Sequence, residues 1–177
     1  MGLIDGWKYC PRCASVLAGD AARVECAACG FVAYGSSVPG AEAVLLDGEG
    51  RVLLGRRRFE PRLGYWDLPG GFLEEGEEPL DALRREVREE TQLEVEPLRF
   101  LGHWNEPYDG RVVLCLTWLA RGLGDPRPGD DLVELKWFAA SEIPWDELAF
   151  THYPAALSAG LGKQYAQSAG LDPQLDG

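Results

Sequence analysis

Three glutamates on one predicted helix have the spacing of a divalent-cation site. Glu86, Glu89 and Glu90 stand at i, i+3 and i+4, which places their side chains on one patch of a helix surface. Like charges held this close repel one another, and a bound cation relieves the repulsion. Carboxylate oxygens are the ligands that Mg²⁺ and Mn²⁺ prefer, with phosphate oxygens and water completing the octahedron. The spacing therefore indicates metal-assisted chemistry on a phosphorylated substrate, and the alternative is an acidic surface helix paired with neighbouring arginines.

Four cysteines near the N-terminus could hold a second kind of metal ion. Cys10 and Cys13 make one C-x-x-C pair, and Cys26 and Cys29 make the other. Two such pairs across a short loop supply the four corners of a tetrahedral zinc site. Ligation would stabilise a segment that has few apolar side chains. The spacing predicts a structural zinc ribbon over residues 1–36, with a redox pair or plain surface cysteines as the alternatives.

Three other reactive side chains stand alone in the sequence. Cys115 lies in the apolar run of residues 112–116, which predicts a buried core residue and makes a reactive thiol the lesser alternative. His103 and His152 are single histidines with no partner visible in the sequence. We expect an ordinary structural role for each histidine.

Composition limits the class of protein. The chain has 177 residues, a hydrophobic content of 46% and a formal net charge of −12 at pH 7, so it can bury a core of ordinary size. The negative charge argues against non-specific nucleic-acid binding, which needs Lys and Arg to neutralise phosphates. No basic region followed by an apolar run opens the chain, and no long apolar stretch follows. We therefore expect a cytoplasmic protein with no membrane partner.

The pattern of apolar residues predicts the elements that position these side chains. Leu80, Leu83 and Val87 recur on one side of a helix that starts at Pro79 and ends near residue 91. A hairpin is predicted around the turn of residues 47–50, and a terminal helix after the last strand. The strands are expected at residues 41–46, 52–56, 98–104, 111–120 and 134–138, and the helix at 155–169. These elements form one domain over residues 37–170, followed by a loose tail over residues 171–177.

The stretch from residue 71 to residue 93 resembles the Nudix box, G-x5-E-x7-R-E-U-x-E-E-x-G-U, in which U is aliphatic. The matching residues are Gly71, Glu77, Arg85, Glu86, Val87, Glu89, Glu90 and Leu93. Gln92 stands where the pattern has Gly, at the expected left-handed end of the helix. The resemblance extends over roughly residues 41–149. It implies an α/β fold, a Nudix α/β/α sandwich with a mixed sheet, preceded here by the small zinc ribbon.

The resemblance also implies a reaction and the residues that perform it. The chain would be a Mg²⁺- or Mn²⁺-dependent hydrolase in which a metal-bound water attacks a bridging diphosphate. The metal ligands would be Glu86, Glu89, Glu90 and the backbone carbonyl near Gly71. Glu89 is the first choice for the base, and Glu134 is an additional candidate for binding water or metal. Glu77 and Arg85 would form an internal ion pair that braces a loop against the helix.

Residues outside the box suggest how a substrate could be held. Arg56 and Arg58 could clamp phosphates, with a solvated strand edge as the alternative. Trp66 and Tyr108 could stack on a base, with core packing as the alternative. Pro107 lies near a position where ADP-ribose pyrophosphatases commonly carry Pro. A ribbon before a Nudix domain is similar to the NADH pyrophosphatases, but their S-Q-P-W-P-F-P-x-S array is absent here.

Two classes of function follow from these observations. The first is hydrolysis of a nucleoside diphosphate linked to a sugar or to a second nucleotide, with nucleoside triphosphates as second choice. The alternative is a catalytically weak module that senses a nucleotide and acts through a protein or nucleic-acid partner. Loss of a catalytic Glu would mark such a module, and none is lost in this sequence. A homodimer is compatible with either class.

Overall fold

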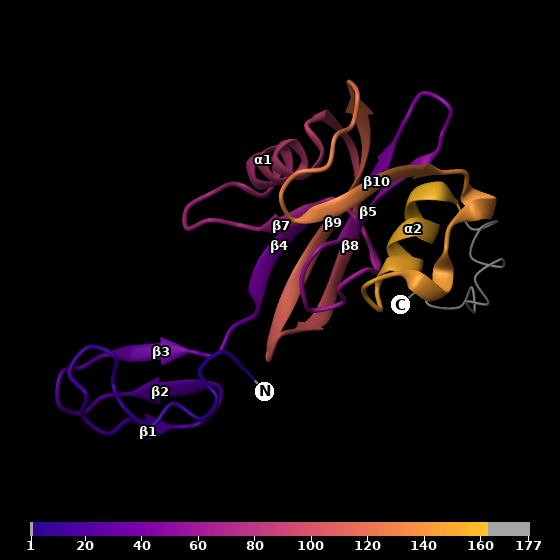
Figure 1. Cartoon of the computed structure of the whole chain (residues 1–177). Helices are drawn as coiled ribbons and strands as arrows, with labels where there is room; N and C mark the ends of the chain where they lie inside the picture. The colour runs from indigo at the N-terminus through magenta and orange to yellow at the C-terminus, as the bar shows by residue number, and fades with distance from the viewer. Residues whose placement is uncertain (1, 163–177) are drawn as a thin grey trace.

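The computed structural model describes residues 2–162, which form two separate β-sheets (Figure 1). The smaller sheet is antiparallel, in the order β1-β2-β3, and belongs to the cysteine-containing segment. Its strands are β1 (Ala18–Gly19), β2 (Arg23–Glu25) and β3 (Val32–Tyr34). Residues 35–37 connect this small sheet to the first strand of the larger sheet. Figure 1 shows the small sheet at the lower left, below the larger sheet.

The larger sheet has seven strands and carries the two α-helices. The strands are β4 (Val38–Leu46), β5 (Val52–Arg57), β6 (Trp66–Asp67), β7 (Gly70–Phe72), β8 (Glu94–Tyr108), β9 (Arg111–Leu123) and β10 (Leu132–Phe138). The helices are α1 (Pro79–Thr91) and α2 (Tyr153–Leu161), and two short 3₁₀ turns span Ala140–Glu142 and Trp145–Glu147. The main order is β10-β5-β4-β9-β8, with β6 paired to β5 and β7 paired to β4. Strands β4 and β9 are parallel while their neighbours are antiparallel, so the sheet is mixed.

The two faces of this sheet bury two different cores. Successive side chains of a strand point to opposite faces, and in β4 Ala43 and Leu45 pack with α1, whereas Val44 packs with α2. The core under α1 includes Leu83 and Val87 of the helix itself. Figure 1 shows α1 and α2 on opposite sides of the sheet. The expected α/β/α sandwich with a mixed sheet is confirmed.

Most predicted elements are present, with longer strands than expected. Helix α1 has the predicted bounds, and the hairpin closes around residues 47–50. Strands β8 and β9 extend well past the predicted ranges. Register shifts in β8 interrupt the alternation of apolar residues, which hid its length from the sequence pattern. Helix α2 starts two residues early, and the predicted helix beyond residue 162 and the tail lie outside the described residues.

No helix within residues 2–162 is long and apolar enough to cross a membrane.

The end of α1 has the left-handed turn that the sequence pattern indicated. Gln92 has φ 60° and ψ 14°, and its backbone N–H donates to the carbonyl of Arg88 at 2.9 Å. A side chain with a Cβ is strained in this conformation, by about 1–2 kcal/mol. The helix therefore ends where the box pattern places its Gly, although the residue there is Gln.

The substitution Gln92→Gly should raise the free energy of unfolding by about 0.5–1 kcal/mol. Relief of the left-handed strain exceeds the extra chain entropy that Gly gives the unfolded state. Urea unfolding of the two proteins measures the difference. Gln92→Ala keeps a Cβ and should stay within about 0.5 kcal/mol of the parent; a Gly variant less stable than the parent would contradict the strain argument.

Candidate active site

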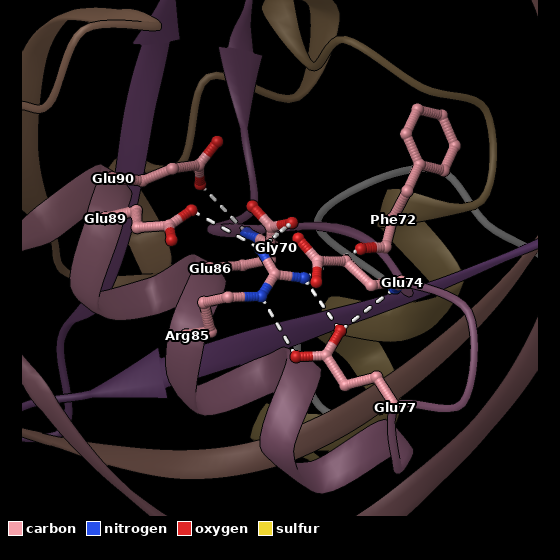
Figure 2. Close-up of polar contacts among 8 residues, drawn as sticks. All are labelled: Gly70, Phe72, Glu74, Glu77, Arg85, Glu86, Glu89 and Glu90. Carbon is pink, nitrogen blue, oxygen red and sulfur yellow. Dashed lines mark hydrogen bonds and ion pairs between the residues drawn. The ribbon is translucent and has the colours of Figure 1, made fainter.

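The three glutamates of the box lie together along α1, on the side that faces β7. Leu83 and Val87, on the adjoining side of the helix, pack in the core. Glu86 and Glu90 are half-buried and Glu89 is exposed, and Figure 2 shows the three side chains together with Gly70. The Glu90 carboxylate accepts a hydrogen bond from the backbone N–H of Gly70 at 2.9 Å. The helix thus presents carboxylate oxygens directly to the backbone of β7.

Two glycines allow this approach. A Cβ at Gly70, where φ is 155°, would lie 2.7 Å from the Cβ of Glu42. A Cβ at Gly71 would lie 2.7 Å from a carboxylate oxygen of Glu86. Both distances are shorter than real Cβ contacts allow, so the backbone can pass between β4 at Glu42 and the carboxylate of Glu86 only without side chains.

Arg85 connects the loop before α1 to the helix. Its guanidinium donates to both carboxylate oxygens of Glu77, at 2.9 and 2.8 Å, and to Glu86 at 2.7 Å (Figure 2). It also donates to the carbonyl of Phe72 at 3.0 Å. These hydrogen bonds from Arg85 lower the pKa of Glu77 to about 2. The predicted ion pair between Glu77 and Arg85 is confirmed, and it fixes the loop against the helix.

Charge at this site remains strongly negative. Burial raises the pKa of Glu90 well above its usual value, and the negative charge of Asp67 adds to the effect. Burial also raises the pKa of Glu86. Arg85 is the one cationic side chain within residues 2–162 that contacts these box carboxylates. A divalent cation would offset the remaining charge, so the donor set fits Mg²⁺ or Mn²⁺.

Two aspartates that the sequence analysis missed complete the acidic rim. Asp130 and Asp131 line a cavity together with Glu86, Glu89 and Glu90. Their loop is held against the end of α1, because the backbone N–H of Gly129 donates to the carbonyl of Glu90 at 2.8 Å. The available signal was the Gly-Asp-Asp sequence of residues 129–131, two residues before the strand predicted at residues 134–138.

The structure places Glu134 opposite Arg56 in the sheet. This residue is exposed, and its carboxylate lies 3.8 Å from Arg56 on the neighbouring strand. It lines none of the cavities described within residues 2–162, whereas Asp131 lines two of them. The reason is the strand register, since Glu134 pairs with Arg56 in the ladder between β10 and β5.

The expected arginine clamp is also placed differently. Arg56 lies over the ring of Trp66 at 4.9 Å, and Arg58 donates to the carbonyl of Leu132 at 2.9 Å. Trp66 is buried in the core against Phe138, so it is not available to stack on a base. Arg57 lines the cavity instead, because alternation along β5 directs it to the face opposite to that of its neighbour Arg56.

Tyr108 is the predicted substrate contact that the structure brings to the site. It lines the same cavities as Gly70, Gly71 and Phe72, and its hydroxyl accepts from Arg57 at 3.3 Å. Its ring meets that of Phe72 edge to face. The cavity therefore has an aromatic wall and a cationic group beside the acidic rim of α1.

His152 has partners that its sequence position did not reveal. One ring nitrogen lies 2.9 Å from Glu42 and the other 3.1 Å from Glu106. Burial lowers the pKa of His152, but hydrogen bonds to Cys115 and Glu42 outweigh it and raise the value to about 11. Cys115 is buried, as predicted. These residues line the same cavity as Arg57 and Tyr108. His103 is exposed on β8 and lines none of the cavities described within residues 2–162.

The fold and the box carboxylates agree with one family of known proteins. The model of the NUDIX domain matches residues 37–157 of the chain. The chain belongs to the Nudix hydrolase family. Its relatives include an ADP-ribose pyrophosphatase of Methanocaldococcus jannaschii, 35% identical over 62% of this chain and 68% of the relative. A crystal structure of a NUDIX hydrolase from Nitrosomonas europaea is similar with a TM-score of 0.73 and 27% identity, over 86% of this chain and 90% of that one.

A second group of relatives is longer than this chain. The NAD-capped RNA hydrolase NudC of Pseudomonas aeruginosa is 31% identical over 77% of this chain and 49% of the relative. This Nudix chain therefore spans about half the length of the NAD-capped RNA hydrolases that it matches.

The N-terminal cysteines form a separate cluster with the dimensions of a zinc site. Their sulfurs all lie within 4.8 Å of one another; those of Cys10 and Cys29 are 3.6 Å apart, and those of Cys13 and Cys26 are 3.5 Å apart. Zn–S bonds of about 2.3 Å in a tetrahedron require sulfur separations of roughly 3.8 Å. The backbone N–H of Arg12 points at the sulfur of Cys10 at 3.4 Å, as in a metal knuckle. The four thiols of Cys10, Cys13, Cys26 and Cys29 thus fit a tetrahedral ion.

We predict that Mg²⁺ stabilises this chain more at pH 8 than at pH 5. In the metal-free chain, the raised pKa of Glu90 means that stability falls as the pH rises from 4.5 through that value. A bound cation reverses this loss, but at low pH it must first displace the proton. At about 100 times the Kd, the midpoint of thermal unfolding should rise by roughly 5–10 °C at pH 8.

Differential scanning calorimetry of matched variants checks this prediction. Glu90→Gln should abolish most of the Mg²⁺ effect, while Glu49→Gln, in the exposed β4–β5 turn, should keep it. An equal rise at both pH values, or one unchanged in Glu90→Gln, would show that the cation binds elsewhere.

Proposed function

We propose that this Nudix hydrolase cuts a phosphoanhydride bond in a nucleoside diphosphate linked to another moiety. An ADP-ribose-like compound or a dinucleotide is the first choice, and a nucleoside triphosphate the second. The observation that carries the proposal is the position of the α1 carboxylates, which face the Gly70–Gly71 backbone beside a cavity lined by Arg57 and Tyr108. ADP-ribose and an NAD cap, named for the relatives, are both nucleoside diphosphates linked to a second group.

In this proposal, Glu86, Glu89, Glu90 and the carbonyl of Gly71 hold Mg²⁺ or Mn²⁺. When bound, the cations neutralise charge on nonbridging phosphate oxygens and acidify water. Arg85 and Glu77 keep the loop and helix at fixed separation, so that the carboxylates and the Gly71 carbonyl converge. Their arrangement before substrate arrives lowers the cost of ordering the site.

Glu89 is the proposed base that takes a proton from the attacking water. It is exposed, and its one polar contact within residues 2–162 is Arg85 at 3.3 Å. The carboxylate is therefore free to move toward a water molecule at the rim. Asp131, on the other side of the same cavity, is the second candidate and replaces Glu134 in that role. Both carboxylates border the space that a diphosphate would occupy.

Arg57 and Tyr108 are the proposed contacts to the part of the substrate beyond the diphosphate. Arg57 is half-buried, paired with Asp67, and bonded to Tyr108. Its position over the ring of Phe150, at 5.2 Å, adds a cation–π contact. These contacts hold the guanidinium rigid, so it can orient a polar substrate group next to the aromatic wall.

The cysteine cluster supports a separate proposal about the N-terminal segment. We infer that Cys10, Cys13, Cys26 and Cys29 bind one structural Zn²⁺ within residues 1–36. All four ligands are protein sulfurs, which leaves no coordination position for catalysis. The ion would supply folding free energy for a segment whose sheet strands are only two or three residues long.

Product analysis tests the enzymatic proposal. The purified chain is incubated with ADP-ribose, NADH, NAD, diadenosine polyphosphates, UDP-sugars and nucleoside triphosphates, with Mg²⁺ or with EDTA. We expect release of a nucleoside monophosphate that requires the cation. Glu89→Gln should lower kcat by about 100- to 10,000-fold, as expected for loss of a general base. Tight binding of one nucleotide without cleavage of any would instead favour the sensing module.

A second pair of variants tests the choice between the acidic residues outside the helix. Asp131→Asn should lower kcat at least about tenfold, because its carboxylate borders the cavity of α1. Glu134→Gln should change kcat less than about twofold, because its partner is Arg56. Steady-state kinetics on the substrate identified above measures both, and the reverse ranking would restore Glu134 as the extra acidic group.

A further inference from the structure

A buried cluster of three metal-ligating side chains lies apart from both the α1 carboxylates and the four paired cysteines. Ligand atoms of Glu42, Cys115 and His152 all lie within 4.8 Å of one another. The three residues are 8%, 7% and 6% exposed. They are among the residues that line the cavity of Arg57 and Tyr108. A carboxylate, a thiol and an imidazole have thus been brought together where water has limited access.

The fold assembles this cluster from three distant parts of the chain. In the parallel ladder of β4 and β9, Glu42 is opposite Thr117 and Gly40 is opposite Cys115. Glu42 and Cys115 therefore lie on adjacent strands and point to the same face of the sheet. They are offset by two residues along the ladder. His152 comes from the segment before α2, which covers that face. The close arrangement depends on the sheet register and is not a local sequence feature.

His152 and Glu42 are each oriented by a hydrogen bond to a residue outside the cluster. Nδ1 of His152 lies 3.1 Å from Glu106, which also accepts from the backbone N–H of Thr151 at 3.1 Å and its hydroxyl at 2.7 Å. The hydroxyl of Thr117 donates to Glu42 at 2.5 Å. A carboxylate on one histidine nitrogen, with the other nitrogen directed at further ligands, is the usual outer arrangement of a protein metal site.

We propose that Glu42, Cys115 and His152 bind Zn²⁺ or a similar borderline divalent cation. Thiolate and imidazole ligands select such ions over Mg²⁺. Three protein ligands leave a fourth position, as in zinc sites that keep water or a ligand bound. The thiolate and the Glu42 carboxylate would balance the two positive charges of the ion, which lowers the cost of burying it.

The open position would face the cavity that Arg57 and Tyr108 line. The Gly70–Gly71 backbone lies against Glu42 on one side and against Glu86 of the box on the other. The site is therefore next to, and distinct from, the proposed Mg²⁺ site. A water molecule, or an oxygen or nitrogen atom of a bound nucleotide, is the class of ligand that this position would take. The site itself does not depend on the proposed hydrolytic function.

Metal content and Co²⁺ spectra of the full chain test the proposal. Excess Mg²⁺ is present throughout, so that the α1 carboxylates do not retain the probe ion. The parent should bind two Zn²⁺ per chain, one in the ribbon and one in the cluster. Cys115→Ser should bind one, whereas Val113→Ala, a cavity-lining change on the same strand without a ligand atom, should bind two.

A ribbon variant isolates the new site with its cavity unchanged. The double substitution Cys10→Ser/Cys13→Ser should retain one Co²⁺ per chain, with the charge-transfer absorption of a thiolate ligand. Circular dichroism confirms folding in each variant. A parent that binds one ion, or a double variant that binds none with thiolate absorption, would overturn the proposal and leave His152 as an imidazolium between two carboxylates. A parent with two ions, both retained in Cys115→Ser, would also overturn it.

Discussion

The passage of the Gly70–Gly71 backbone between Glu42 and Glu86 is the constraint on which the rest of the site depends. A side chain at Gly70 would collide with the backbone of β4 at Ala41 and Glu42, and one at Gly71 would collide with the carboxylate of Glu86. Strand β7 pairs with β4 through the same residues, since Glu42 is opposite Gly70 and Ala41 opposite Gly71. The backbone N–H of Gly70 then donates to Glu90 on α1. One short strand thus fixes the helix, the sheet and both carboxylate groups relative to one another.

The negative charge gathered around this strand explains the importance of Arg85. It bonds to Glu77, Glu86 and the carbonyl of Phe72, so one guanidinium both ties the loop down and offsets part of the repulsion. Burial raises the pKa of Glu90 well above its usual value, and Arg85 is the one cationic side chain within residues 2–162 that pairs with Glu86 and Glu89. Such a set of carboxylate donors fits a divalent cation. The acidic composition of the chain is consistent with that use.

The sheet carries polar groups on the face of α2 as well, and these are satisfied differently. His152 lies between Glu42 and Glu106, and threonine hydroxyls accompany each carboxylate. Buried charges are tolerated when each has partners in good geometry, while removal of one partner is costly. Because β4 contributes Glu42 to this network and Ala43 to the core under α1, a single strand links the two layers.

The sequence by itself determined the features that depend on local spacing. These are helix α1 with its three glutamates, the Glu77–Arg85 pair, the left-handed end at Gln92 and the clustered cysteines, because neighbours along a helix or a knuckle are neighbours in space. Only the tertiary structure decided which residues from separate segments meet. It brought Arg57 to the cavity, placed Asp131 beside the α1 carboxylates, and made His152 the partner of two glutamates. Strand register and loop docking place these side chains, and neither follows from the residues next to them.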